Sequence, residues 1–205
     1  MTGNDEIVDL VDENDEVIGR AQMQEVRARN LLRRGAAAIV RNSRGDIYIH
    51  RRADTKAAFP GWYDTVVAGS VMSGESYAQA IRRELAEEIG IDGVQPTFLF
   101  KSRYRATDVN WWTCVFEVVW NQPIQHHGEE VAWGGFMPEP DLVAKLAEWP
   151  FVPGGVQAFQ RYLDQRGLIA VRADARLSGP RAPTPEAGLG SEPVERRPRA
   201  SDGEE

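Results

Sequence analysis

The stretch Gly69-Ser-Val-Met-Ser-Gly-Glu-Ser-Tyr-Ala-Gln-Ala-Ile-Arg-Arg-Glu-Leu-Ala-Glu-Glu-Ile-Gly-Ile91 is the most informative part of this 205-residue sequence. From 75 to 89, apolar residues recur at intervals of three and four positions, which predicts an amphipathic helix. Because a helix turns by about 100° per residue, we expect Glu84, Glu87 and Glu88 within one arc of about 100° on a neighbouring face. The stretch therefore predicts a helix that carries a row of carboxylates.

Three carboxylates on one helix face need a reason to be there. They repel one another, which weakens an isolated helix by a few tenths of a kcal/mol per pair, unless a cation lies between them. Magnesium takes oxygen ligands and is commonly held by one or two carboxylates together with substrate phosphates. We therefore predict Glu84 and Glu88 as the first metal ligands and Glu87 as the third, with manganese as a substitute ion. A solvated acidic face is the alternative.

Turn and cap residues flank the predicted helix. Gly69 begins a loop in which the backbone can come close to a ligand. Ser73 and Gly74 are expected to supply the turn and the cap at the start of the helix. Gly90 lies just past the last apolar position, where glycine forms a left-handed cap with least strain. Arg83 directly precedes Glu84 and is expected to orient a carboxylate or to pack against the loop, with an ordinary surface arginine as the alternative.

Together these positions follow the pattern G-x5-E-x7-R-E-U-x-E-E-x-G-U, where U is aliphatic, and the segment 69–91 resembles the signature box of the Nudix hydrolases. The resemblance implies magnesium-dependent hydrolysis of a nucleoside diphosphate linked to another moiety. It also implies catalytic roles for Glu84, Arg83 and Glu87, and a substrate-binding role for Gly69. The order of predicted elements along the chain indicates an α/β fold, an α/β/α sandwich with a mixed β-sheet between helices.

A hydrolase also needs a base that takes a proton from the attacking water. In the family that base is a glutamate of the box, here Glu84, or a glutamate of a later loop. Glu129 and Glu130 precede a predicted strand at 131–133 and are the later-loop candidates for a base or a further metal ligand. Surface charge at the start of a strand is the alternative for both.

Two arginines end another predicted strand, at 46–50. Arg51 and Arg52 are candidates for binding a phosphate through paired hydrogen bonds, with a solvated strand end as the alternative. His50 shares a face of this strand with Tyr48, opposite Ile47 and Ile49, and is expected to be structural.

Residues outside the box add a narrower resemblance, to the Nudix branch related to isopentenyl diphosphate isomerase, which spans about 6–165. Four segments carry it: 9–19, 51–53 and 59–61, together with Glu75-Ser76 of the box. An isomerase of this kind needs a cysteine in the loop before the box and histidines as metal ligands, but this chain has Ala68, Ser70 and Arg33 at those positions. The complete box favours hydrolysis; isomerase activity and a non-catalytic nucleotide sensor remain as alternatives.

The sequence predicts one folded domain followed by a tail. The domain covers 1–171, with an N-terminal hairpin at 6–20, the box at 69–91 and a last helix at 157–166. The remainder, 172–205, is rich in proline, glycine and charge and has no aromatic residue, so it cannot bury enough apolar surface to fold. We predict a disordered tail, with a segment that folds on a partner as the alternative.

Composition limits the classes of partner. A net charge of −7 and a pI of about 5.1 argue against binding of a nucleic acid duplex. No apolar run is long enough to span a membrane, and the acidic start lacks the plan of a signal peptide. The single cysteine, Cys114, excludes an internal disulfide and favours a cytoplasmic protein. We expect a small-molecule diphosphate as the partner and leave a homodimer open.

Overall fold

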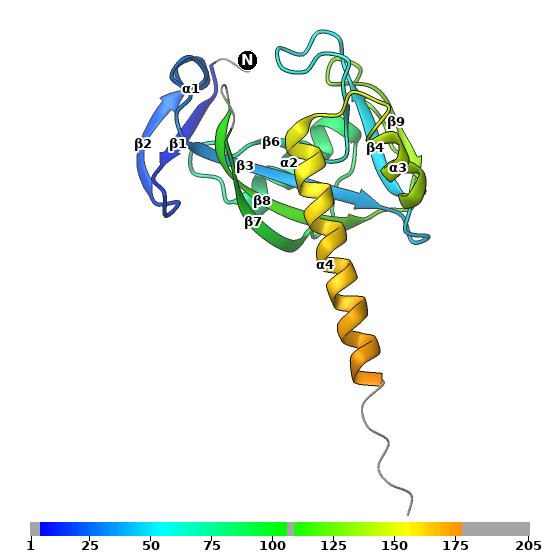
Figure 1. Cartoon of the computed structure of the whole chain (residues 1–205). Helices are drawn as coiled ribbons and strands as arrows, with labels where there is room; N and C mark the ends of the chain where they lie inside the picture. The colour runs from blue at the N-terminus through cyan, green and yellow to red at the C-terminus, as the bar shows by residue number, and fades with distance from the viewer. Residues whose placement is uncertain (1–4, 106–108, 178–205) are drawn as a thin grey trace, which may run out of the picture. The chain divides into compact units, whose positions relative to one another are not determined.

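A single mixed sheet forms the centre of the fold in the computed structural model, which describes residues 5–105 and 109–177 (Figure 1). Its nine strands in the described residues are β1 Ile7–Val11, β2 Val17–Gln22, β3 Arg33–Arg41, β4 Ile47–Arg52, β5 Tyr63–Asp64, β6 Val67–Ser70, β7 Thr97–Arg105, β8 Asn110–Val119 and β9 Val131–Met137. The predicted hairpin near the N-terminus is confirmed, because β1 pairs with β2 in antiparallel fashion.

Strand β3 pairs with four other strands and is the central strand of the sheet. It pairs in parallel with β8 along its whole length, from Arg33 opposite Trp111 to Arg41 opposite Val119. On its other side it pairs with β6, and at its two ends with β1 and β4. The residues 36–40 are all buried, as expected for a strand that is covered on both faces. All strand pairings other than β3 with β8 are antiparallel among the described residues, so the sheet is mixed, as predicted.

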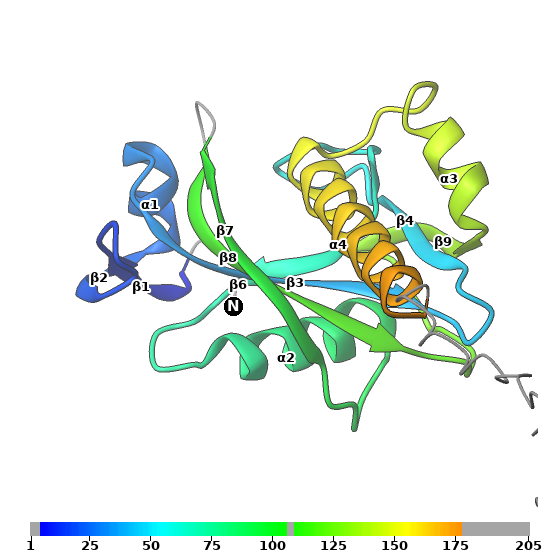
Figure 2. The same cartoon turned by 60° about the horizontal axis from the view of Figure 1, so that its bottom comes forward.

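Helices cover both faces of this sheet. They are α1 Met23–Arg29, α2 Tyr77–Ile89, α3 Glu139–Lys145 and α4 Pro153–Leu177. Leu85 and Ile89 of α2 belong to the core on one face, whereas Phe159 and Tyr162 of α4 belong to the core on the other. Figure 2 shows α2 and the first turns of α4 on opposite sides of β3. The predicted sandwich of α/β type is therefore confirmed.

The last helix differs from its prediction at both ends. It begins at Pro153 instead of residue 157, and it runs to Leu177 instead of ending at 166. Proline suits the first position of a helix. Gly154 and Gly155 follow this proline, and because glycine is a poor helix former, the sequence predicted a helix start that is too late. Gly155 is needed there, because a Cβ on it would lie 2.0 Å from Oδ1 of Asp64.

The predicted tail begins inside α4, whose residues 172–177 are helical. Residues up to Gly167 form one compact unit, and residues 168–205 are grouped in a second. Residues 178–205 lie outside the described part of the chain, so the domain boundary at 171 and the disordered tail stay predictions. No helix within 5–105 and 109–177 has the length and hydropathy needed to cross a bilayer.

Candidate active site

The helix of the box, α2, is fixed at both ends by its own sequence. Ser76 is its N-cap: the hydroxyl accepts a hydrogen bond from the backbone N–H of Gln79 (3.3 Å), and Oε1 of Gln79 accepts one from the backbone N–H of Ser76 (2.9 Å). This reciprocal pair is a capping box. Gly90 ends the helix in the left-handed conformation with φ of 66°, as predicted. The carboxylates of α2 therefore stand on a helix with well-defined ends.

The predicted cap at Ser73 and Gly74 is wrong. The hydroxyl of Ser73 donates to Oδ1 of Asp9 in β1 (2.7 Å), and the backbone N–H of Gly74 donates to Oδ2 of the same carboxylate (3.3 Å). Both residues thus tie the loop of the box to the N-terminal hairpin. Local sequence spacing does not reveal this contact, since Asp9 is far away along the chain.

Arg83 joins three glutamates and the loop. Its Nε and Nη2 donate to the two oxygens of Glu75 (2.9 and 3.0 Å), and Nη1 donates to Glu84 (2.7 Å) and Glu87 (3.2 Å). Nη2 also donates to the carbonyl oxygen of Ser70 (2.9 Å). These bonds raise the pKa of Arg83 and keep it charged. The prediction that Arg83 orients a carboxylate is confirmed in geometry, whereas its catalytic role stays a prediction.

Gly69 makes room for the carboxylate of Glu84. A Cβ at Gly69 would lie 2.0 Å from Cδ of Glu84, so only glycine allows this approach. Only 13% of the Glu84 side chain is exposed. Burial raises the pKa of Glu84, and the charge of Arg83 opposes that shift. Glu87, in contrast, is 59% exposed and lies at the rim of the group.

Glu88 is the most buried carboxylate of the box, with 6% of the residue exposed. Burial first, and repulsion from Glu84 second, raise its pKa to about 8, while the charges of Lys56 and Arg52 oppose the shift. Lys56 also forms an ion pair with Glu130. Two cations from the end of β4 and the loop after it therefore face the buried glutamates of α2.

The structure separates the two predicted arginines. The side chain of Arg52 lies near Glu88, and its Nε donates to the carbonyl oxygen of Ala58 (3.2 Å). Arg51 follows the strand alternation to the opposite face of β4, and its Nη2 donates to Oδ1 of Asp54 (2.7 Å). Only Arg52 is brought to the glutamates of α2. His50 is 2% exposed, as expected for a structural residue.

The two later-loop glutamates are separated as well. Glu130 joins the group through Lys56, whereas the side chain of Glu129 is exposed and only its carbonyl oxygen takes part, accepting from Thr55 (3.4 Å). Lys56 itself was missed by sequence reasoning. A lone lysine in a loop carries no periodic signal, and its position depends on how the segment after β4 folds back toward β9.

The donors gathered here suit a hard divalent cation. Glu84, Glu87 and Glu88 offer only oxygen atoms, which is the ligand type that magnesium prefers. Two of these carboxylates are buried close enough to raise the pKa of Glu88, and a cation between them would relieve that repulsion. Within the described residues, no three Asp, Glu, His or Cys side chains already converge on one point. The assignment of these ligands therefore stays a prediction.

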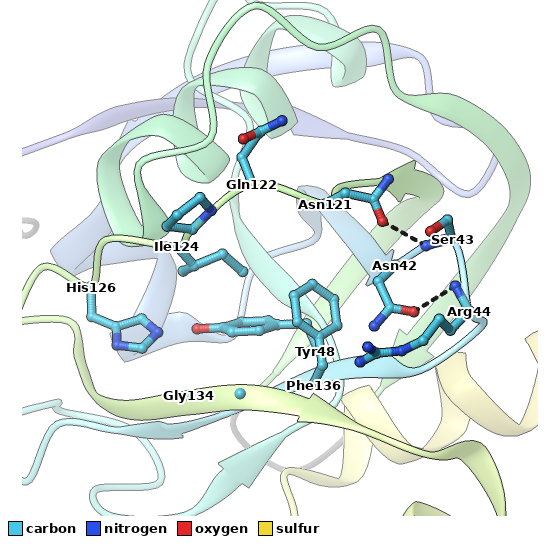
Figure 3. Close-up of a pocket in the computed structure, with 12 residues that line it drawn as sticks. Asn42, Ser43, Arg44, Tyr48, Asn121, Gln122, Ile124, His126, Gly134 and Phe136 are labelled. Carbon is cyan, nitrogen blue, oxygen red and sulfur yellow. Dashed lines mark hydrogen bonds between the residues drawn. The ribbon is translucent and has the colours of Figure 1, made fainter.

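A cavity of about 450 Å³ is lined by Tyr48 of β4, by Gly134 and Phe136 of β9, and by the segments that follow β3 and β8 (Figure 3). The rings of Tyr48 and His126 lie next to each other at one side of the cavity, and the buried Tyr48 hydroxyl has no hydrogen-bond partner among the described residues. The amides of Asn42 and Asn121 line the other side, where they hold the turn after β3 by accepting from the backbone N–H groups of Arg44 and Ser43. The side chains of Asn42, Asn121 and Arg44 are thus already bonded within the chain, whereas the Tyr48 hydroxyl is not.

Comparison with known proteins agrees with this geometry. A family model described as NUDIX domain matches residues 31–159. A Nudix hydrolase of Streptomyces coelicolor is 44% identical over 169 residues, covering 82% of this chain and 93% of the relative. A crystal structure from Deinococcus radiodurans superposes with a TM-score of 0.64 at 28% identity, covering 76% of this chain and 98% of that one.

One further structure shows the same fold with a ligand. The NUDIX domain of NrtR from Shewanella oneidensis, solved with ADP ribose, superposes with a TM-score of 0.54 at 16% identity and covers 64% of this chain and 86% of that one. The box at 69–91, the sandwich that supports it and these matches lead to one conclusion: this chain belongs to the Nudix hydrolase family and is an enzyme.

Proposed function

We propose that the enzyme uses magnesium to hydrolyse a diphosphate linkage in a small molecule, in the first instance a nucleoside diphosphate derivative. The observation that carries the proposal is the pair of buried carboxylates on α2, Glu84 and Glu88, of which the first is held by Arg83 and by Gly69. Burying two like charges side by side is unfavourable unless a cation joins them. A diphosphate substrate brings the phosphate oxygens that complete the shell of such a cation.

Glu84 and Glu88 would hold magnesium, with Glu87 as the third ligand from the rim. When bound, the ion screens phosphate charge and lowers the pKa of a coordinated water. Manganese, which also prefers oxygen ligands, would serve as a substitute. Lys56 and Arg52 face the same place and would bind phosphate oxygens through charge-assisted hydrogen bonds.

The base that takes the proton of the attacking water is a glutamate of this group. Glu84 is the candidate within the box, and Glu130 is the candidate outside it, since Lys56 holds its carboxylate near the box. Glu129 is a weaker candidate because its side chain is exposed. Replacing each by glutamine, followed by the pH profile of kcat, would identify the base: its loss removes the acidic limb of the profile.

Hydrolysis is favoured over isomerisation by two residues of β6. Ala68 and Ser70 lie opposite Ala37 and Gly35 of β3, at the positions where the related isomerases carry cysteine and histidine. Neither residue can protonate or deprotonate a prenyl carbon at neutral pH. The solved complex of the NrtR NUDIX domain with ADP ribose makes nucleoside diphosphate sugars the first compounds to test.

A substrate screen with magnesium tests the proposal. The compounds are nucleotide sugars, ADP ribose, nucleoside triphosphates, dinucleotides and isopentenyl diphosphate, and release of a nucleoside monophosphate, phosphate or pyrophosphate is measured. We expect turnover of a compound with a diphosphate linkage, loss of turnover with a chelator, and loss in the Glu88→Gln variant. Formation of an isomer from isopentenyl diphosphate would overturn the proposal, and tight binding without turnover would indicate a sensor.

We also infer a cytoplasmic location. The only cysteine, Cys114, is a buried free thiol, as expected in a reducing compartment.

Light scattering during size-exclusion chromatography would decide between a monomer and a homodimer.

A further inference from the structure

One buried arginine, Arg33, has no role in the proposed reaction. Arg33 begins β3 and is 6% exposed. Its Nε and Nη1 atoms are buried without a hydrogen-bond partner, and among residues 5–105 and 109–177 no carboxylate lies within ion-pair distance of its guanidinium. A buried ionised group without a counter-charge is strongly unfavourable.

The other arginines of the same strand show what Arg33 lacks. Arg34 donates to the carboxylate of Asp15 (2.7 Å), and Arg41 donates to both oxygens of Glu117 (2.7 and 3.3 Å). Each of these charges is neutralised by an acid of the chain. Among the described residues, Arg33 instead lies over the face of Trp111, with its guanidinium carbon 5.1 Å from the ring centroid, and its Nε and Nη1 find no acceptor. A ring face attracts a cation but accepts none of the directional N–H bonds that a guanidinium offers.

Arg33 lies on a path that leads to the carboxylates of α2. Gly35 is on the same face of β3, and a Cβ there would lie 3.1 Å from the Trp111 ring and 3.5 Å from the carbonyl oxygen of Gly69. Gly69 in turn contacts Glu84. Gly69 pairs with Ala36, which lies three residues after Arg33 in β3. At about 3.3 Å per residue, the backbone of Arg33 is therefore about 10 Å from Ala36 and Gly69. Arg33 shares its face of β3 with Ala37 and Ile39, which pack with α4, whereas α2 packs on the other face, so a ligand that contacts both Arg33 and the glutamates has to pass the edge of the sheet at β6.

The positive charge extends between Arg33 and the proposed phosphate-binding residues. Burial, followed by repulsion from Arg27, lowers the pKa of Arg33 to about 10, so the side chain is still charged at neutral pH. The charge of Arg27 also acts on Lys56, which faces Glu84 and Glu88. Arg27 thus lies within electrostatic reach of both Arg33 and Lys56, although the whole chain carries a net charge of −7.

We propose that Arg33 binds a phosphate group of the ligand, with Trp111 as the wall that positions its guanidinium. Phosphate offers the oxygen acceptors that Nε and Nη1 lack, in the paired arrangement that suits a guanidinium. The inference rests on the proposed function only for the identity of the ligand, namely a substrate with a phosphate besides the one attacked. Free phosphate has the same chemistry. The cavity of Figure 3 suits this role less well, because its Arg44 is already paired with Asp46.

Calorimetric titration of the full chain in a chelator tests this without any turnover. Inorganic phosphate and inorganic pyrophosphate are the probes, and the variants are Arg33→Met, Arg33→Lys and, as a matched control, Arg44→Met. We expect binding to weaken about tenfold or more in Arg33→Met and less in Arg33→Lys, and to stay unchanged in Arg44→Met. Tighter binding of pyrophosphate than of phosphate would indicate a diphosphate ligand; equal binding would indicate a single terminal phosphate.

Thermal unfolding separates this role from a structural one. If Arg33 waits for a ligand, Arg33→Met has a Tm at or above that of the unaltered protein, and phosphate raises its Tm no further. Equal binding by Arg33→Met and the unaltered protein, loss of binding only in Arg44→Met, or no binding of either probe by the unaltered protein would overturn the proposal. Because no hydrolysis is needed, failure of the proposed reaction would leave these results unchanged, and Glu88→Gln should still bind phosphate through Arg33.

Discussion

Two arginines of this enzyme, Arg83 in α2 and Arg33 in β3, are both mostly buried, but only Arg83 is paired with acids of the described chain. Arg83 donates to Glu75, Glu84 and Glu87 and to a backbone carbonyl oxygen, so the chain itself satisfies its charge. Arg33 has an aromatic ring and no acid among the described residues. The first arrangement fixes a geometry before any ligand arrives. The second leaves N–H donors of Arg33 available for a ligand.

This difference separates positioning from binding within one site. The Arg83 network decides where the carboxylates of α2 stand, and removing it should change turnover. The Arg33 end of β3 should change affinity, and removing it should leave the fold intact.

The largest effect is expected from the two buried carboxylates of α2, Glu84, which accepts from Arg83, and Glu88. Glutamine at Glu84 or Glu88 keeps the shape of the side chain but removes a negative ligand, so turnover should fall at least about a hundredfold. Circular dichroism should show an unchanged fold. Steady-state kinetics with the substrate found in the screen are the measurement, and Glu25→Gln on α1 is the control. Near-normal turnover in both variants would refute their role as ligands.

Arg83→Lys should lower kcat about tenfold or more, with a smaller change in KM. Lysine keeps the charge but cannot bridge Glu75, Glu84 and the Ser70 carbonyl at once, because it lacks the planar fork of donors. The control is Arg34→Lys, which weakens another arginine that is paired with an acid, Asp15, away from the glutamates of α2. A similar loss of kcat in both variants would mean that Arg83 acts only on stability.

Asp64 is an acidic counterpart of Arg33, since it is 5% exposed and has only backbone N–H donors as hydrogen-bond partners in the described residues. Burial raises its pKa from 3.8 to about 7. Between these values the folded state holds a proton that the unfolded state has lost. The associated stability is therefore complete below about pH 4 and is lost as the pH rises through about 7.

The Asp64→Asn variant should remove this dependence. At pH 8 we expect it to be more stable than the unaltered protein, by on the order of 3 kcal/mol, and the difference should shrink as the pH falls toward 4. Urea unfolding at several pH values measures it. A difference that does not vary with pH would contradict the assignment of the buried carboxyl.

The smallest effect concerns the end of the box. Gly90→Ala forces alanine into φ of 66° and places a Cβ 3.2 Å from Cβ of Gln125, so it should cost about 1 kcal/mol of unfolding free energy. Gly93→Ala is the control, because Gly93 has a similar φ of 68° with nothing within 4 Å of its Cβ position. The excess cost of Gly90→Ala over Gly93→Ala reports the contact with Gln125. Equal costs would show that backbone strain is the whole effect.

The fold was predictable where the signal is local. The helix α2, its end at Gly90 and the hairpin at the N-terminus follow from periodicity and turn residues. The cap was misplaced because Asp9 takes the hydroxyl of Ser73, a contact between distant segments. The start of α4 was missed because Gly155 reads as a helix breaker, and its close approach to Asp64 is visible only after folding.

The candidate site was predictable where the family pattern applies, and less so elsewhere. Glu84, Glu88 and Arg83 lie together as their spacing indicates. Sequence reasoning could not separate Arg51 from Arg52, because that depends on which face of β4 meets α2. Lys56 was not recognised as a site residue, since a lysine in a loop shows no pattern until the chain folds. Arg33 was noted only because it replaces a histidine of the related isomerases, and its burial without an acid is visible only in the folded sheet.

The parallel pairing of β3 with β8 has a consequence for synthesis of the chain. Arg33 stands opposite Trp111 in that pairing, and β3 is flanked by β8 along its full length. Contacts between segments so far apart close large loops, which slows folding, and here they cannot form until the ribosome has released β8. Until β8 is made, the edge of β3 and its apolar residues remain exposed. Aggregation of the nascent chain is therefore most favoured in the interval between the synthesis of β3 and that of β8.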